Sequence, residues 1–270
     1  MKPRYIFEAP AICYRSTVHA PASPPQIEPQ LLMLAYRSGI FPMADHRDDT
    51  EVFWIEPRMR AILPLEGFHM SRSLAKTIRR GRFRVTCNQA FSAVIEACAA
   101  PRDSESDSWI SHRIQASYEE LHALGYAHSI ECWDDSGESG APGLLVGGLY
   151  GVGFDRVFCG ESMFSHQTDA SKVALAWLVA ALRHAGATLL DCQFMTEHLA
   201  SLGAAEITQK RYLAMLRAAQ DDRDDTATGE TRASALPLPE AYASLLSLAE
   251  SEGLSSSPGK LIAQLLTQTS

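Results

Sequence analysis

Two polar side chains interrupt the apolar segment TLLDCQF, residues 188–194. In an extended strand successive side chains point to opposite faces, so Asp191 and Gln193 would lie on one face. Burying such a pair is costly unless it is hydrogen-bonded or faces a cleft. The segment therefore has two interpretations. One is a hydrogen-bonded polar pair in the core, and the other is an acceptor pair that receives a proton from an attacking amine or orients that amine.

A second carboxylate stands in the segment FCGESMFS, residues 158–165. Glu161 and Ser162 interrupt a run of aromatic and methionine side chains, and Gly160 lets another backbone or a ligand approach closely. A carboxylate between apolar neighbours needs a partner, and the ammonium group of a ligand would supply one. The apolar side chains of this segment favour the core over a pocket: Phe158, Met163 and Phe164.

Other chemistries find weaker support. Cys159 and Cys192 could act as nucleophiles, but the nearest histidines, His166 and His198, follow the ends of their strands, and strand cysteines are usually packing residues. The nine histidines form no H-E-x-x-H motif, so no metal site is expected. The glycines at 147–153 lie between two strands rather than before a helix, which a dinucleotide-binding motif requires.

These segments belong to an alternating series of helices and strands. Apolar residues at helical spacing predict helices at 27–39, 71–81, 88–100, 111–125, 171–186, 196–203 and 208–219. Apolar, β-branched and aromatic runs predict strands at 51–65, 83–87, 126–133, 144–154, 155–164 and 188–194. The expected helix caps are Ser71 or Ser73, Asn88, Thr196 and Thr208. This order predicts an α+β or α/β fold on a mostly antiparallel central sheet.

Length and composition are those of a soluble globular protein. The 270 residues correspond to one large or two modest domains, and 46 % hydrophobic with 21 % charged residues argue against disorder, collagen-like repeats and a coiled coil. No apolar run reaches about 18 residues, and the N-terminus lacks a signal-peptide pattern, so we expect a cytoplasmic protein without a membrane partner. The six scattered cysteines favour reduced thiols.

The two ends of the chain differ from its middle. Residues 1–26 predict an irregular lead-in that ends in a proline-rich stretch. After about residue 219 the composition changes to Asp, Thr, Gly, Ala and Ser, which predicts a linker at roughly 220–234. The last residues have weak helical periodicity and form either a small appended helical piece or a tail.

The charge is unevenly distributed. With 24 basic and 32 acidic residues the net charge is −8, which by itself discourages nucleic-acid binding. One run nevertheless carries six basic residues and no acidic one: Arg72, Lys76, Arg79, Arg80, Arg82 and Arg84. This run is either a solvated helix face or a phosphate-binding stripe.

Several runs together resemble one family, the bacterial leucyl/phenylalanyl-tRNA-protein transferases. The matching runs are YRSGIFP (36–42), WIEPRMR (54–60), MSRS (70–73), SWI (108–110), GYAHSIECW (125–133), LVGGLYGV (145–152), VFCGESMFS (157–165), DASKVAL (169–175), LLDCQF (189–194) and HLASLGAAEI (198–207). They cover most of residues 31–216 in the order of the family. GESMFS, ASK, DCQ and LASLGA at these separations form a specific signature.

The resemblance implies a fold and an activity. The fold is a small N-terminal domain, residues 1–70, packed on an acetyltransferase-like (GNAT-type) domain, residues 71–219, and residues 220–270 have no counterpart in the shorter members. Members transfer Leu or Phe, and less readily Met, from aminoacyl-tRNA to proteins that begin with Arg or Lys. The product carries a destabilising N-terminus that an adaptor delivers to the Clp protease.

The resemblance also implies roles for individual residues. Asp191 and Gln193 match the catalytic pair of the family, and Glu161 and Ser162 fall in its aminoacyl-adenosine site, where Gly160 allows close approach. Trp109 resembles an aromatic residue that holds the terminal adenosine. The amino-acid side-chain pocket would be lined by Leu149, Phe158, Met163, Leu175, Leu178, Leu182 and Leu190.

Two positions depart from the family pattern. Met43 stands where some members have Trp, so no aromatic ring is available there to stack on the 3′ adenosine. Leu178 stands where some members have Phe, which predicts a different pocket width and a different preference between Leu and Phe.

The implied reaction needs little beyond positioning. An aminoacyl ester is already activated, so no cofactor, metal or covalent nucleophile is expected. We expect Gln193 to accept a hydrogen bond from the attacking α-amine, and Asp191 to orient Gln193 and stabilise the developing positive charge. The basic run 72–84 would hold acceptor-stem phosphates without reading sequence.

Three alternatives remain at this point. The first is an acyl-CoA-dependent N-acetyltransferase, but the junction SHQTDASK (165–172) lacks the glycines of its pyrophosphate-binding loop. The second is a transferase of leucine to N-terminal Asp or Glu. The third is a non-catalytic tRNA-binding module, which would need the basic run but not the pairing of Asp191 with Gln193.

Overall fold

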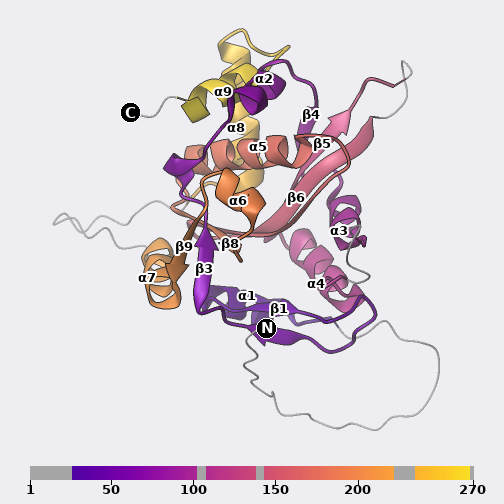
Figure 1. Cartoon of the computed structure of the whole chain (residues 1–270), viewed down its shortest axis with the longest axis vertical. Coiled ribbons are helices and arrows are strands. Elements are labelled where there is room, and N and C mark those ends of the chain that lie inside the picture. The colour runs from indigo at the N-terminus through magenta and orange to yellow at the C-terminus, as the bar shows by residue number, and fades with distance from the viewer. Residues whose placement is uncertain (1–25, 102–107, 138–142, 222–234, 268–270) are drawn as a thin grey trace, which may run out of the picture.

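The computed structural model describes residues 26–101, 108–137, 143–221 and 235–267 (Figure 1). The lead-in expected before residue 26 and most of the expected linker lie outside the described residues. The helices are α1 (Pro29–Arg37), α2 (Arg72–Arg79), α3 (Phe91–Ala99), α4 (His112–Ala123), α5 (Ala170–Ala185), α6 (Glu197–Ser201), α7 (Gln209–Gln220), α8 (Leu238–Ser251), α9 (Gly259–Thr267) and the short 3₁₀ helix η1 (Leu65–Gly67). The strands are β1 (Phe41–Met43), β2 (Phe53–Ile55), β3 (Met59–Ile62), β4 (Arg84–Cys87), β5 (Ala127–Asp134), β6 (Leu144–Phe154), β7 (Val157–Ser165), β8 (Leu189–Gln193) and β9 (Ala205–Thr208).

Within the described residues, a seven-stranded sheet in the order β4-β5-β6-β7-β8-β3-β9 forms the centre of the molecule. Its neighbouring strands are antiparallel, except β7 and β8, which run parallel. Parallel neighbours need a crossover connection, and α5 provides it. The predicted mostly antiparallel central sheet is confirmed.

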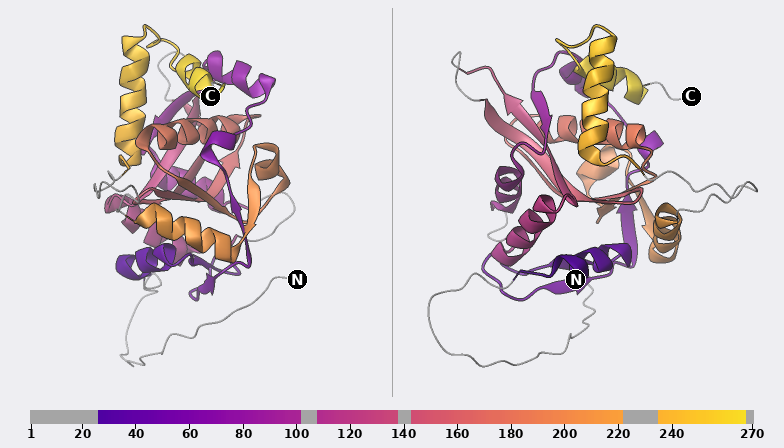
Figure 2. Two further views of the ribbon diagram at one scale, coloured as in Figure 1. Left: turned by 90° about the vertical axis from the view of Figure 1, so that its left-hand side faces the viewer. Right: turned by 180° about the vertical axis from the view of Figure 1, so that it is seen from behind.

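Helices cover both faces of this sheet (Figure 2). On one face α5 packs against β5, β6 and β7, and its apolar residues, among them Leu175 and Leu178, join one core cluster. On the other face α3 and α4 pack against the sheet, and Tyr118 of α4 joins a second cluster. Neighbouring residues of β7 separate the two cores, since Phe158 belongs to the first and Cys159 to the second.

The N-terminal part of the described chain contributes to both sheets. β1 and β2 form a small antiparallel pair that lies with α1 at one end of the molecule, near the label N in Figure 1. β3 instead lies inside the large sheet between β8 and β9. Residues before position 70 therefore supply one of the central strands.

The C-terminal segment packs on the main body of the protein. α8 contacts α5, and α9 contacts α2 and α5. A Cβ atom added to Gly259 would lie 2.2 Å from the carbonyl oxygen of Ile78, so only glycine permits this close approach of α9 to α2. The hydroxyl of Ser257 donates to the carbonyl of Arg79 at 3.1 Å. The appended helical piece that the sequence left open is thus part of the core.

The expected caps form at three of the four helices. Ser71, Thr196 and Thr208 accept hydrogen bonds from backbone N–H groups three residues later. The cap predicted at Asn88 is wrong, because α3 begins after Ala90 without a side-chain cap. Asn88 has a left-handed backbone, with φ of 57°, and its side-chain oxygen accepts from the N–H of Ser129 at 2.9 Å.

Strand β9 was not predicted. It has only four residues, follows α6 and precedes α7, and forms one edge of the large sheet. None of the described helices is long and apolar enough to cross a membrane.

Candidate active site

The parallel strands β7 and β8 separate beyond Cys159 and Asp191, the last residues that pair. A bulge occurs in each strand at this point. Glu161 is an extra residue in the pairing of β7 with β6, and Cys192 is an extra residue in the pairing of β8 with β3. A bulge redirects the side chains next to it and ends regular pairing, so the two strands open a gap between Glu161 and the end of β8.

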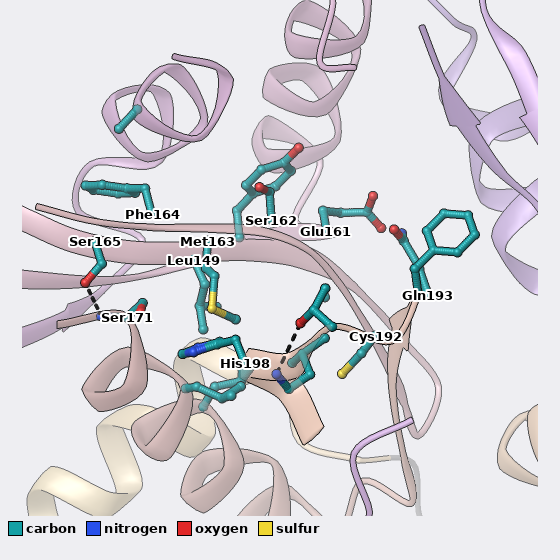
Figure 3. A pocket seen from close by; sticks show the side chains of 18 of the residues that line it. Leu149, Glu161, Ser162, Met163, Phe164, Ser165, Ser171, Cys192, Gln193 and His198 are labelled. Carbon is teal, nitrogen blue, oxygen red and sulfur yellow. Dashed lines mark hydrogen bonds between the residues drawn. The ribbon is translucent and has the colours of Figure 1, made fainter. Parts of the chain in front are cut away.

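A cavity of about 730 Å³ begins at this gap. Strand β7 lines it with Gly160, Glu161, Ser162, Met163 and Phe164, and β8 with Leu190, Cys192 and Gln193. Figure 3 shows Glu161 and Gln193 facing each other on one side, with Leu149, Met163 and His198 grouped on the opposite side of the strand. The cavity therefore joins a polar end to an apolar part.

The carboxylate of Glu161 lies at the polar end and is buried. The hydroxyl of Tyr118 donates to its Oε2 atom at 3.1 Å, and Tyr36 hydrogen-bonds to Tyr118. Burial raises the pKa of Glu161 from 4.5 to about 7, although the nearby polar side chains of Tyr36, Gln193 and Tyr118 oppose the shift. Its Oε1 atom is buried and has no hydrogen-bond partner among the described residues. Glu161 can therefore bind a ligand donor and can change its protonation near neutral pH.

Gln193 occupies an unusual backbone conformation beside this carboxylate. Its φ of 62° is in the left-handed region, which residues with a side chain adopt rarely. The side-chain amide faces Glu161 (Figure 3), and its Nε2 atom is buried with no partner in the described chain. Strained, unsatisfied groups of this kind gather at functional sites.

Asp191 lies behind Gln193 rather than in the cavity wall and is fully buried. Its Oδ1 atom accepts from the backbone N–H of Gln193 at 2.9 Å. Arg60 of β3 donates to both carboxylate oxygens, at 2.8 and 2.6 Å, and the hydroxyl of Tyr212 donates to Oδ2 at 2.9 Å. The expected contact between Asp191 and Gln193 therefore runs through the backbone of Gln193, not through its side chain.

Four residues of this polar network were not predicted from the sequence: Arg60, Tyr212, Tyr36 and Tyr118. One signal was available for Arg60, because a guanidinium between apolar residues of a strand needs an anionic partner. The tyrosines gave no comparable signal, since a tyrosine on the apolar face of a helix is usual in a core.

Most of the other residues singled out from the sequence line the cavity. They are Met43, Trp109, Leu149, Gly160, Ser162, Met163, Leu175, Leu178 and Leu190. Phe158 and Leu182 belong to the core cluster around α5 and do not line the cavity.

The cavity also has residues that were not singled out as its lining. Among them are Ala97, Pro101, Phe194, Thr196 and His198. The Nε2 atom of His198 is buried without a partner in the described part of the chain. Burial, followed by the charge of Lys172, lowers the pKa of this imidazole.

A thiol nucleophile is not favoured by these surroundings. Cys192 reaches the cavity wall, but burial and the charge of Asp191 raise the pKa of its thiol above the usual value. The same two causes raise the pKa of the Cys159 thiol. The reactive thiolate is therefore disfavoured at both positions.

The six basic residues of the run 72–84 are all exposed, on α2, in the turn that follows it and at the start of β4. Arg82 donates to the side chain of Gln167 at 3.1 Å, and Arg84 forms an ion pair with Asp135 at 2.8 Å. The helix buries Leu74, Ala75 and Ile78 and presents its cationic side chains to solvent. This arrangement suits either interpretation of the run.

The geometry of the cavity suits a reaction in which the protein acts mainly by holding its ligand in place. An unpaired acceptor on Glu161 and an unpaired donor on Gln193 face each other at the end of a cavity with an apolar part. A ligand that carries an ammonium group next to a carbonyl would satisfy both atoms.

Comparison with known proteins gives one family. The family described as leucyl/phenylalanyl-tRNA protein transferase matches residues 62–217, and its N-terminal domain matches residues 26–58. A protein of Novosphingobium aromaticivorans is 60 % identical over 268 residues, covering 92 % of this chain and 98 % of the relative. Proteins of Zymomonas mobilis and Rhodopseudomonas palustris are 57 % and 50 % identical, covering 72 % and 79 % of this chain and 69 % and 88 % of those relatives. All three relatives are named leucyl/phenylalanyl-tRNA-protein transferase.

Proposed function

The chain belongs to the leucyl/phenylalanyl-tRNA-protein transferase family, and from this membership we propose its reaction. The enzyme transfers leucine or phenylalanine, and less readily methionine, from aminoacyl-tRNA to the N-terminal amine of proteins that begin with Arg or Lys. The observation that carries this proposal is the pair of unpartnered atoms on Glu161 and Gln193 at the end of the cavity.

The cavity has the size and lining for an aminoacyl-adenosine end. Ligand pockets usually measure about 300–1,000 Å³, and this one measures about 730 Å³. Leu149, Met163, Leu175, Leu178 and Leu190 offer an apolar surface to the amino-acid side chain. The adenosine would lie toward Trp109 and Met43, with Ser162 beside it. Because Phe158 and Leu182 are buried behind this lining, their role is to support it.

The reaction forms one bond and breaks one. The neutral α-amine of the acceptor protein attacks the ester carbonyl carbon, the C–N bond forms, and the ester C–O bond breaks to release the ribose hydroxyl of the tRNA. The amine loses a proton and the ribose oxygen gains one. Holding the amine and the ester in attack geometry supplies most of the rate, because the ester is already activated.

We propose a role for each polar residue. Glu161 binds the α-ammonium group of the aminoacyl residue through its free Oε1 atom. Gln193 can donate to the ester carbonyl through its free Nε2 atom and orient the attacking amine through its side-chain oxygen, since an amide is too weak a base to take the proton of the amine. Asp191 holds Gln193 through the backbone N–H, and its negative charge favours the positive charge that develops on the amine.

The tRNA body would bind to the basic residues of the run 72–84. Exposed cations on an acidic protein offer phosphate contacts that fix position without reading sequence. The six residues proposed for this role are Arg72, Lys76, Arg79, Arg80, Arg82 and Arg84.

The finer description of the fold is also a proposal. The parallel pair β7 and β8 that separates around a substrate cavity supports an acetyltransferase-like domain over 71–219, with a smaller N-terminal domain over 1–70. β3 would then connect the two, because it lies in the large sheet. We further propose a cytoplasmic location and delivery of the products to the Clp protease adaptor, as the family membership implies.

A transfer assay tests the function. Purified protein is incubated with radiolabelled Leu-tRNA and an unfolded protein that begins with Arg, beside matched proteins that begin with Asp and Ala. Label on the Arg protein alone is the expected result. Label on the Asp protein would assign the chain a different acceptor, and bound tRNA without transfer would indicate a binding module.

Asp191→Asn tests the mechanism in the same assay. We expect it to lower turnover much more than tRNA binding, because Asp191 acts on the attacking amine through Gln193. Equal losses of turnover and tRNA affinity would contradict this assignment.

A further inference from the structure

Arg60, which the proposed mechanism does not use, is one of the most deeply buried cations of the described chain. Its side chain is 1 % exposed and forms a two-point ion pair with Asp191, which is 0 % exposed. The third nitrogen, Nη1, donates to the carbonyl of Gly39 at 3.1 Å. The guanidinium carbon lies 4.7 Å from the ring centre of Phe41 and 4.4 Å from that of Tyr212. The guanidinium is thus held on its edge and on its faces.

Both oxygens of the Asp191 carboxylate also accept hydrogen bonds from several donors. Oδ1 accepts from Arg60 Nε and from the N–H of Gln193, and Oδ2 accepts from Arg60 Nη2 and from the hydroxyl of Tyr212. A carboxylate has about four lone-pair sites, and here four donors occupy them. No site is left on Asp191 for the proton that the attacking amine releases.

The same network reaches the backbone of Gln193. The oxygen that pairs with Arg60 Nε also accepts the N–H of Gln193, whose left-handed conformation needs support from its surroundings. If the carboxylate rotated, this N–H would lose its partner and the side-chain amide would no longer be directed at Glu161.

We propose that Arg60 and Tyr212 are positioning residues that lock Asp191 as a fixed anion and thereby hold Gln193 in its productive conformation. Asp191 then acts as a fixed charge and an anchor, not as a carrier of the proton. This inference rests on the proposed function for its catalytic part, whereas the locking of Gln193 can be measured without any activity.

Tyr212→Phe is the primary test, because it removes one hydroxyl and keeps the ring that faces Arg60. Tyr242→Phe is the matched control, since the hydroxyl of Tyr242 also donates a partly buried hydrogen bond, at 2.7 Å to the carbonyl of Val85, beside the other core cluster. We expect Tyr212→Phe to lower kcat about tenfold through misplacement of Gln193, with KM for Leu-tRNA unchanged. The control should retain wild-type kcat.

Arg60→Lys provides the second variant, because it keeps the charge but cannot form the two-point pair. We expect a loss of kcat of about 100-fold. In an Asp191→Asn background neither Arg60→Lys nor Tyr212→Phe should add its full loss, because both act through Asp191. If the loss of kcat in each double variant equals the product of the losses in its two single variants, the proposal is overturned.

Hydrogen exchange at the Gln193 backbone amide separates this inference from the proposed function. We expect slow exchange in the wild type and faster exchange in Tyr212→Phe, at equal global stability. Unchanged exchange overturns the locking role whether or not the enzyme is active. A wild type that transfers nothing would refute the proposed function and the catalytic part of this proposal, while the exchange result would still decide the locking.

Discussion

Glu161→Gln is expected to stabilise the folded protein above pH 7 and to abolish most of its activity. The carboxylate of Glu161 is buried, and burial raises its pKa from 4.5 to about 7. Between these two values the unfolded chain has released the proton while the folded protein still holds it. The free energy of unfolding of the wild type therefore falls as pH rises through this window, and it levels off above about pH 7.

The magnitude follows from the size of the pKa change. One pKa unit corresponds to about 1.4 kcal/mol, so ionised Glu161 costs the folded protein about 3 kcal/mol above pH 7. A glutamine has the same shape and no charge, and its side-chain oxygen can still accept from Tyr118. The variant should thus gain up to about 3 kcal/mol near pH 8 and about nothing near pH 4.5.

Urea unfolding followed by tryptophan fluorescence at a series of pH values measures this difference. Glu206→Gln is a suitable control, because Glu206 is exposed on β9 and its substitution should give a small difference at every pH. An equal difference in the free energy of unfolding between Glu161→Gln and the wild type near pH 4.5 and near pH 8 would refute a raised pKa of Glu161. Transfer activity of Glu161→Gln should fall although its stability rises, because the variant lacks the anion proposed to bind the α-ammonium group.

Three further predictions follow from the cavity, the basic run and the buried ion pair. Leu178→Phe should shift the preference between Phe-tRNA and Leu-tRNA toward Leu by about tenfold, since a methylene-scale change is worth about 1–3 kcal/mol; an unchanged ratio in a competition assay would contradict the pocket assignment. Replacing Arg79 and Arg80 together by Ala should weaken tRNA binding and lower the salt slope by about 1–2; salt-independent binding would exclude phosphate contacts there. Arg60→Met should lower the free energy of unfolding by about 3–5 kcal/mol, because Asp191 stays buried without its partner; a smaller loss in denaturant titration would mean that the carboxylate is rehydrated.

The helices and most strands were predictable because their signals are local. Ser71, Thr196 and Thr208 cap their helices as predicted, and Gly39 and Gly186 have the positive φ expected where a helix stops. Strand β9 escaped prediction because its four residues become a strand only by pairing with β3.

The packing of the C-terminal helices could not be predicted either. At Gly259, α9 closely approaches the backbone of α2. A contact of this kind depends on the shape of the partner helix and leaves no local pattern in the sequence.

By itself, the sequence determined the family and the segments proposed to carry the chemistry, because polar residues inside apolar strands are visible without a structure. Glu161, Gln193 and Asp191 were found in this way. Only the tertiary structure decided which partners surround these residues. Arg60 meets Asp191 across 131 positions of the chain, and Tyr118 meets Glu161 across 43. Burial raises the pKa of Glu161 and Tyr118 limits this rise, while Arg60 pairs with both oxygens of Asp191. Hydrogen bonding and desolvation are set by neighbours in space rather than in sequence.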